Sequence, residues 1–95
     1  KLGTLIVINN KKKTTGIITD GQIRRKTHES KNIHLKKVKN IMTKKPISVN
    51  KDTLVLKALS IMNSRKITSL CVFNQKNKNK TIGIIHIHNI LSNTN

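Results

Sequence analysis

Short apolar runs separated by polar turns form the main pattern of this chain. Residues 4–9 and 15–19 are two such runs, rich in β-branched side chains and joined by a lysine-rich turn. This arrangement predicts an antiparallel β-hairpin. A helix over residues 21–28 is expected to follow, because Thr19 and Gln22 fit the Ser/Thr-x-x-Glu/Gln capping box. That capping role accounts for both polar residues by itself, and it is compatible with a ligand-binding role.

The clearest helix pattern lies in the second half of the chain. Apolar residues recur every three or four positions over residues 53–65, which predicts an amphipathic helix with Asp52 as its N-cap. A brief strand is expected before this helix, over residues 47–49. A second hairpin is expected after it, from residues 68–74 and 81–85, with a final helix beginning at the end of the chain.

A polar connector, residues 31–37, links the two halves, and Ile33 and Leu35 are its apolar positions. We expect these two side chains to pack onto a core. A short helical turn over residues 38–43 follows, and Pro46 ends it, because the residue before a proline prefers an extended backbone. The side chains expected to point inward from this turn are Val38, Ile41 and Met42.

The two hairpins are related by an internal repeat. When Gly16 is set against Gly83, residues 1–9 fall on residues 66–74 after a two-residue insertion in the second turn, and apolar positions match apolar positions. The second copy also has residues 41–65 upstream of its hairpin, whereas the first has no counterpart of them. The chain is therefore interpreted as one and a half repeats of a strand-helix-strand-strand-helix unit, with a mixed α/β (α+β) fold.

Composition limits the functions that this chain can have. It has 95 residues and no apolar run of membrane-spanning length. Its single cysteine, Cys71, aligns with the strand residue Ile6, so we expect a buried apolar role in a reducing, cytoplasmic compartment. With three acidic residues in all, Asp20, Glu29 and Asp52, the chain offers no catalytic carboxylate pair and no nucleophile–base pairing.

The net charge of +17 allows several interpretations. Lysine, asparagine and isoleucine make up close to half of the chain, a bias that A- and T-rich codons would produce, and the lysines fall in turns and on polar faces. A solvated surface is the interpretation we favour. Single-strand binders interleave stacking aromatics, and Phe73 is the single aromatic here. The charge could also face an acidic partner domain.

Four segments carry a resemblance to a known family. They are the T-D-G-x-h-R-R signature in residues 16–25, the Val-Lys-Asn-Ile-Met-Thr segment at 38–43, residues 66–70, and the G-h-h-H-h-H signature in residues 83–91. Together they resemble the C-terminal CBS-domain pair of the bacterial arabinose-5-phosphate isomerase family. The resemblance implies that residues 1–37 are the C-terminal half of a first CBS domain plus a linker. Residues 38–95 would be the second CBS domain.

The resemblance also implies a function for the parent protein. In that family a sugar isomerase (SIS) domain interconverts ribulose 5-phosphate and arabinose 5-phosphate for Kdo and lipopolysaccharide synthesis. This chain would be the non-catalytic regulatory or assembly module of such an enzyme. We expect a homodimer formed through the CBS pair and a larger oligomer formed through the SIS domain, without nucleic acid or membrane as a partner. No cofactor is required, and a nucleotide or CMP-sugar is the ligand that the resemblance allows.

Nucleotide-binding CBS domains carry a G-h-h-(T/S)-x-x-D motif, in which the hydroxyl contacts phosphate and the carboxylate holds the ribose. Thr19 matches the hydroxyl, but Gln22 and Asn89 replace the carboxylate in the two copies, and His86 replaces the second hydroxyl. His86 and His88 lack a third partner for Zn²⁺, so we expect them to line the cleft or to contact the isomerase domain. The candidate ligand-binding residues are Thr19, Asp20, Gln22, Arg25, Thr43, His86, His88 and Asn89.

Two other functions remain open on the sequence. One is a stand-alone CBS ligand-binding protein, which an upstream SIS domain would argue against. The other is a basic nucleic-acid-binding domain, for which a sequence preference, and not only salt-sensitive binding, would be needed.

Overall fold

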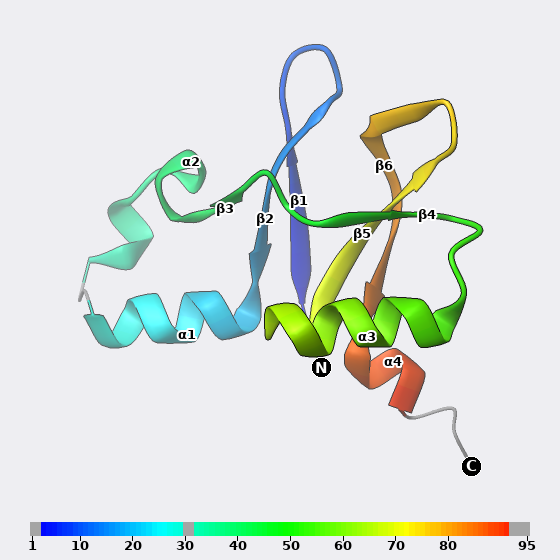
Figure 1. Cartoon of the computed structure of the whole chain (residues 1–95). Coiled ribbons are helices and arrows are strands. Elements are labelled where there is room, and N and C mark those ends of the chain that lie inside the picture. Colours follow the sequence, from blue (N-terminus) through cyan, green and yellow to red (C-terminus); the bar gives the residue numbers. More distant parts are fainter. Residues whose placement is uncertain (1–2, 30–31, 92–95) are drawn as a thin grey trace. The chain divides into compact units, whose positions relative to one another are not determined.

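Two three-stranded sheets organise residues 3–29 and 32–91, which the computed structural model describes apart from the side chains of Asn89 and Leu91 (Figure 1). The chain divides into one unit over Lys1–Pro46 and a second over Ile47–Asn95. Helices and strands occur in both units, so the expected mixed α+β class is confirmed. None of the helices in this described part is long and apolar enough to cross a membrane.

The first unit is built on the predicted hairpin. Its sheet has the order β1-β2-β3, and both pairings are antiparallel. The last strand, β3, was not predicted from the sequence, because two residues are too few to show a strand pattern. The elements in chain order are β1 (Thr4–Ile8), β2 (Thr14–Thr19), α1 (Asp20–Glu29), a 3₁₀ turn (Ile33–Leu35), α2 (Val38–Ile41) and β3 (Thr43–Lys44).

The second unit follows the predicted order of elements. Strand β5 lies between β4, to which it is parallel, and β6, to which it is antiparallel. The elements are β4 (Ser48–Asn50), α3 (Val55–Arg65), β5 (Ser69–Asn74), β6 (Asn77–His86) and α4 (Ile87–Leu91). Helix α3 covers this sheet through a core whose buried members are Val49, Ala58, Met62 and Leu70.

The two hairpins share one register. In the first, Thr4 pairs with Thr19 and Val7 with Gly16; in the second, the partners at the same positions are Ser69 with His86 and Val72 with Gly83. Each register then shifts by one residue at the same place, directly beyond the glycine. Such a bulge kinks the strand. The internal repeat predicted from the sequence is therefore present in the backbone pairing of both units.

A second backbone contact repeats at the point where each hairpin leads into a helix. The N–H of Asp20, at the start of α1, donates to the carbonyl of Gly3 over 3.0 Å. The N–H of Ile87, at the start of α4, donates to the carbonyl of Thr68 over 2.8 Å. Because Gly3 and Thr68 are equivalent in the repeat, both strand–helix junctions are tied to the preceding strand in the same way.

Helix α3 starts later than the sequence predicted, and Asp52 does not cap it. The chain first makes a turn in which the Thr53 N–H donates to the Asn50 carbonyl, and Leu54 is the N-cap without a side-chain hydrogen bond. The Asp52 carboxylate instead pairs with Lys51 at the surface, at 3.3 Å. Since the turn occupies residues 50–53, the helix begins only at Val55.

Several residues expected in a core are exposed. Leu35 of the connector is 74% exposed and Val38 of the following helical turn is 46% exposed, so neither side chain is buried. Leu54 is 76% exposed and Val55 54%, because α3 contacts its sheet through its later turns. The tip of the second hairpin is also tighter than predicted: β6 begins at Asn77, so Lys78 and Lys80 belong to a strand and Lys76 stays in the turn. Cys71 is fully buried, as predicted.

Candidate functional site

The capping box predicted at the first junction is formed. The backbone N–H of Thr19 donates to Oε1 of Gln22 over 2.8 Å, and the backbone N–H of Gln22 donates to Oγ1 of Thr19 over 3.2 Å. This reciprocal pair satisfies two donors at the start of α1 that would otherwise lack partners. Both side chains are partly buried. The sequence interpretation of Thr19 and Gln22 as capping residues is therefore confirmed.

Strand β3 brings a third candidate residue to this junction. Thr43 pairs with Ile17 of β2, and Nε2 of Gln22 donates a hydrogen bond to Oγ1 of Thr43. The Gln22 amide thus bonds with its oxygen to the strand–helix turn and with its nitrogen to β3. Three of the eight candidate residues, separated by up to 24 positions in sequence, meet at one place within the first unit.

Arg25 and Asp20 lie at the same junction but differ in what they contact. Nη1 of Arg25 lies 3.6 Å from the point where a Cβ on Gly21 would be, and Oγ1 of Thr19 lies 3.9 Å from it. The guanidinium therefore folds back along α1 toward the start of the helix. Asp20 is directed elsewhere, because its carboxylate pairs with Arg24 at 3.3 Å on the exposed side of α1. Together these groups could hold an anion or the hydroxyls of a sugar.

The second junction uses histidines where the first uses a hydroxyl. His86 is 8% exposed and ends β6. Its Nδ1 accepts a hydrogen bond from the backbone N–H of His88 over 3.1 Å, so the imidazole caps the start of α4 as the Thr19 hydroxyl caps α1. The two imidazole rings stack, with centroids 5.0 Å apart and planes 17° from parallel. The side chain of Asn89 lies outside the described residues.

No metal site accompanies these histidines in the described residues: no group of three His, Cys, Asp or Glu side chains lies close enough together to hold an ion. The three carboxylates of the chain form surface ion pairs, Asp20 with Arg24, Glu29 with Lys26 and Asp52 with Lys51.

Burial raises the pKa of the Cys71 thiol above its ordinary 9.0, and a hydrogen bond with the Thr81 side chain opposes this rise. A buried, neutral thiol is a poor nucleophile.

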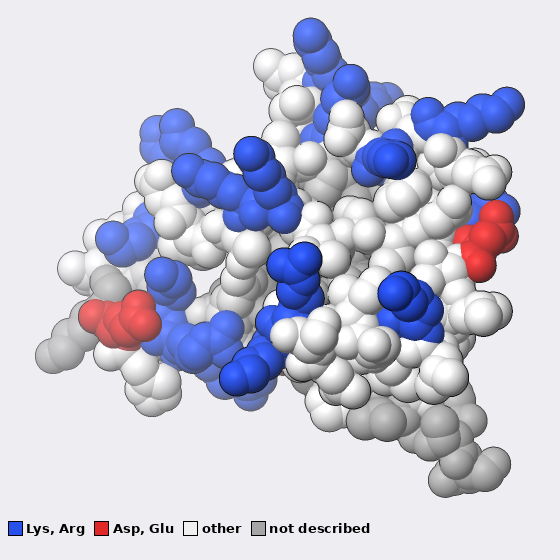
Figure 2. Space-filling view, viewed as in Figure 1, with Lys and Arg blue, Asp and Glu red and all other residues white. Residues whose placement is uncertain are grey.

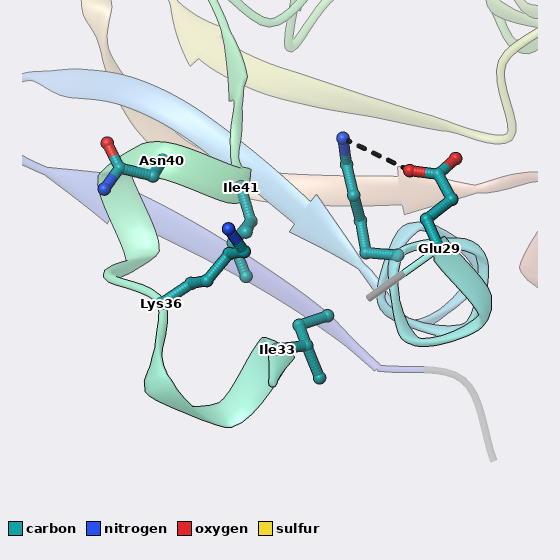
Figure 3. Close-up of a pocket in the computed structure, with 6 residues that line it drawn as sticks. Glu29, Ile33, Lys36, Asn40 and Ile41 are labelled. Carbon is teal, nitrogen blue, oxygen red and sulfur yellow. Dashed lines mark ion pairs between the residues drawn. The ribbon is translucent and has the colours of Figure 1, made fainter. Parts of the chain in front are cut away.

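A pocket that the sequence did not predict lies between the end of α1 and α2. Its volume is about 260 Å³. Figure 3 shows Ile33 and Ile41 on its walls, with the ion pair between Lys26 and Glu29 on one side. None of the eight candidate residues lines it; its lining consists of Lys26, Glu29, Ile33, Lys36, Asn40 and Ile41. The pocket is separate from the strand–helix junction at the other end of α1.

Positive charge is spread widely over the surface. Figure 2 shows lysine and arginine side chains scattered over the visible face, with few acidic groups between them. The lysines include all three non-glycine residues with positive φ in the described part, Lys12, Lys45 and Lys66. This distribution is typical of a solvated basic surface and does not single out one binding groove.

The hairpin–helix junction, with an apolar strand leading through a glycine into a capped helix, occurs once in each unit of this chain. Residues 38–94 match the CBS domain family, and the chain belongs to that family. The predicted resemblance to CBS domains is thereby confirmed.

Solved structures support the same fold. A conserved protein from Pyrococcus horikoshii superimposes with a TM-score of 0.82 at 26% identity, covering 95% of this chain and 66% of that one. The CBS-domain pair of protein MJ0100, solved with 5′-methylthioadenosine and S-adenosylmethionine, superimposes with a TM-score of 0.78 at 24% identity, covering 94% of this chain and 67% of that one. The chain thus has the fold of a CBS-domain pair.

Curated proteins with similar sequences include arabinose 5-phosphate isomerases. An uncharacterized protein of Rickettsia prowazekii is 39% identical over 97% of this chain and 27% of its own length. The arabinose 5-phosphate isomerase KdsD of Yersinia pestis is 31% identical over 95% of this chain and 26% of its own length. The chain therefore spans about a quarter of the length of the curated relatives that it matches. The similarity to arabinose-5-phosphate isomerases predicted from the sequence is confirmed.

Proposed function

We propose that this chain is the regulatory or assembly CBS pair of a cytoplasmic arabinose-5-phosphate isomerase, which interconverts ribulose 5-phosphate and arabinose 5-phosphate for Kdo and lipopolysaccharide synthesis. The observation that carries the proposal is the similarity to KdsD over 95% of the chain. The chain matches only 26% of that relative. The isomerase centre would lie in the remainder of the parent protein, since all three carboxylates here are in surface ion pairs.

The two strand–helix junctions are the proposed ligand sites. At the first, Thr19 and Gln22 present a hydroxyl and an amide, with the Arg25 guanidinium nearby. At the second, His86 takes the capping position. MJ0100, solved with two adenosine compounds, and CBSX2, solved with AMP, are CBS-type structures that contain adenosine-based ligands. We therefore propose a nucleotide or a CMP-linked sugar as the ligand of this chain, and a homodimer as its assembly.

The amide of Gln22 influences which ligand would fit. A carboxylate accepts two hydroxyl hydrogen bonds, as a ribose diol requires, whereas an amide offers one oxygen and one NH₂. In this structure the Gln22 oxygen accepts from Thr19 and its nitrogen donates to Thr43. Both ends of the Gln22 amide are therefore already hydrogen-bonded within the protein, and this leaves little capacity to hold the ribose of an adenosine compound. We infer that a sugar phosphate or a CMP-sugar, held by Arg25, fits the first junction better.

Thermal-shift measurements on the full parent protein test this proposal. AMP, ATP, CMP, CMP-Kdo and arabinose 5-phosphate would be compared, each up to 1,000 times its expected dissociation constant, where a bound ligand stabilises by about 4 kcal/mol. At least one should raise the melting temperature. A parent protein that isomerises arabinose 5-phosphate but responds to none of these ligands would leave assembly as the role of the pair. A protein without isomerase activity would contradict the proposal.

A further inference from the structure

Ser69 differs from the other buried polar side chains of the described residues. It is 8% exposed, and its Oγ is buried without a hydrogen-bond partner. Leaving a buried hydroxyl unpaired is costly, and native structures rarely do so without a reason. Serine at a strand position is also a poor choice for packing, since β-branched and aromatic residues fit strands better. Ser69 was not singled out from the sequence, because one serine at the start of a strand forms no recognisable motif.

The position of Ser69 connects it to the second junction. It begins β5 and pairs directly with His86, the last residue of β6. Directly paired residues on neighbouring strands point to the same face of the sheet. The unpaired hydroxyl and the capping imidazole, both 8% exposed, are therefore side by side on one face. In the first unit the equivalent pair is Thr4 and Thr19.

The chemistry around Ser69 favours a ligand that accepts hydrogen bonds. Because Nδ1 of His86 accepts from the His88 N–H, the neutral His86 ring carries its proton on Nε2. His88, stacked on His86, is the exposed member of the group. Each of the three carboxylates of the chain is paired with a cation of the same helix or turn.

We propose that Ser69 is a ligand-binding residue of the second junction, where its hydroxyl donates a hydrogen bond to an oxyanion of the ligand, a phosphate or a carboxylate. The inference rests on the proposed ligand-binding function and adds to it the residue and the chemical group recognised. The ligand supplies the partner that the Ser69 hydroxyl lacks.

This assignment predicts opposite effects of one substitution on stability and on binding. Ser69→Ala removes an unpaired buried hydroxyl, so the ligand-free protein should melt about 2–5 °C higher. The same change removes a ligand contact, so affinity should fall about tenfold. A purely structural serine would lower stability when truncated and leave affinity unchanged. Ser69→Thr keeps the hydroxyl and matches Thr4 of the first repeat, so it should bind as the wild type does.

The experiment compares wild-type parent protein with its Ser69→Ala and Ser69→Thr variants, and with Ser60→Ala, an exposed serine on α3, as control. Melting temperatures and affinities are measured with AMP, arabinose 5-phosphate and CMP-Kdo. Adenosine and arabinose serve as matched compounds without an oxyanion. We expect Ser69→Ala alone to combine higher stability with weaker binding of the phosphate- or carboxylate-bearing compounds.

Three results would overturn the inference. A Ser69→Ala variant that binds these compounds as tightly as the wild type would remove Ser69 from the site while leaving the proposed function intact. A lower melting temperature for ligand-free Ser69→Ala would show that the hydroxyl already has a partner. Wild-type protein that binds none of the three anionic compounds would overturn the ligand-binding function and this inference together.

Discussion

Gly16 and Gly83 occupy equivalent positions in the two hairpins, opposite Val7 and Val72, yet their surroundings differ. A Cβ on Gly16 would collide with Sδ of Met42 and lie 2.7 Å from its Cγ. Nothing lies within 4 Å of the corresponding point on Gly83. The close approach at Gly16 is what allows β3 to pair with β2, and it thereby brings Thr43 to the Gln22 amide.

Gly16→Ala should therefore destabilise the protein by about 1–3 kcal/mol, because the added methyl group overpacks against Met42 and the Thr43 carbonyl. Gly83→Ala is the matched control. Its backbone has no positive φ, so alanine should be neutral or stabilise by about 0.4–1 kcal/mol through the unfolded state. Urea denaturation of both variants provides the comparison. Equal stability of the two would contradict the close contact at Gly16.

The chain's amide at position 22 gives a second prediction. Gln22→Asp restores the carboxylate of nucleotide-binding CBS domains, and a charged acceptor strengthens the hydrogen bonding to the ribose by about 1 kcal/mol in total. The affinity for AMP should rise roughly fivefold, measured by calorimetric titration. Gln75→Asp, at the exposed turn of the second hairpin, adds the same charge elsewhere and should leave the affinity unchanged. An equal gain from both variants would indicate an effect of net charge alone.

Lys66 ends helix α3 in the left-handed conformation, with φ 56° and ψ 43°. Its N–H and that of Ile67 donate to the last carbonyls of the helix, as in a glycine-type C-cap. Because glycine adopts this conformation without strain, Lys66→Gly should stabilise the protein by about 0.5–1 kcal/mol. Lys57→Gly, within the helix, should instead destabilise it by about 1 kcal/mol. In thermal denaturation, the melting temperature should rise for Lys66→Gly and fall for Lys57→Gly. A melting temperature of Lys66→Gly below that of the wild type would show that the left-handed backbone at Lys66 is not strained.

Burial of Cys71 gives a prediction for alkaline pH. Its pKa is raised in the folded state, so between 9.0 and that higher value the folded protein holds a proton that the unfolded chain has released. Stability should therefore be fully retained below pH 9 and fall as the pH rises further. Cys71→Ala lacks the titrating thiol, and its stability should fall less steeply between pH 9 and 10.5 in urea titrations. Parallel pH profiles would contradict the raised pKa.

Regular patterns made most of the fold predictable from the sequence. The apolar runs around Val7 and Val72 specified both hairpins, and their shared register follows from the aligned glycines. The capping box was predictable because Thr19 and Gln22 contact each other across one helical turn. Local pattern was sufficient wherever the interacting residues are close in sequence.

Long-range contacts were not predictable in the same way. The pairing of β3 with β2, and with it the contact between Thr43 and Gln22, joins residues 21 positions apart through a two-residue strand. The capping role of His86 was missed because histidine is not among the usual N-cap residues. The exposure of Leu54 and Val55 follows from the direction in which α3 meets its sheet, which periodicity alone does not specify.

Isomerase assays of the parent protein with and without residues 1–95 distinguish a regulatory or assembly role of these residues from a catalytic one. We expect the truncated protein still to interconvert ribulose 5-phosphate and arabinose 5-phosphate, because the proposed catalytic centre lies outside these residues. We also expect truncation to abolish the response to nucleotide or CMP-sugar ligands, or to change the oligomeric mass. Complete loss of turnover in a truncated protein that remains folded and keeps its oligomeric mass would show that these residues contribute to catalysis, and would contradict the account.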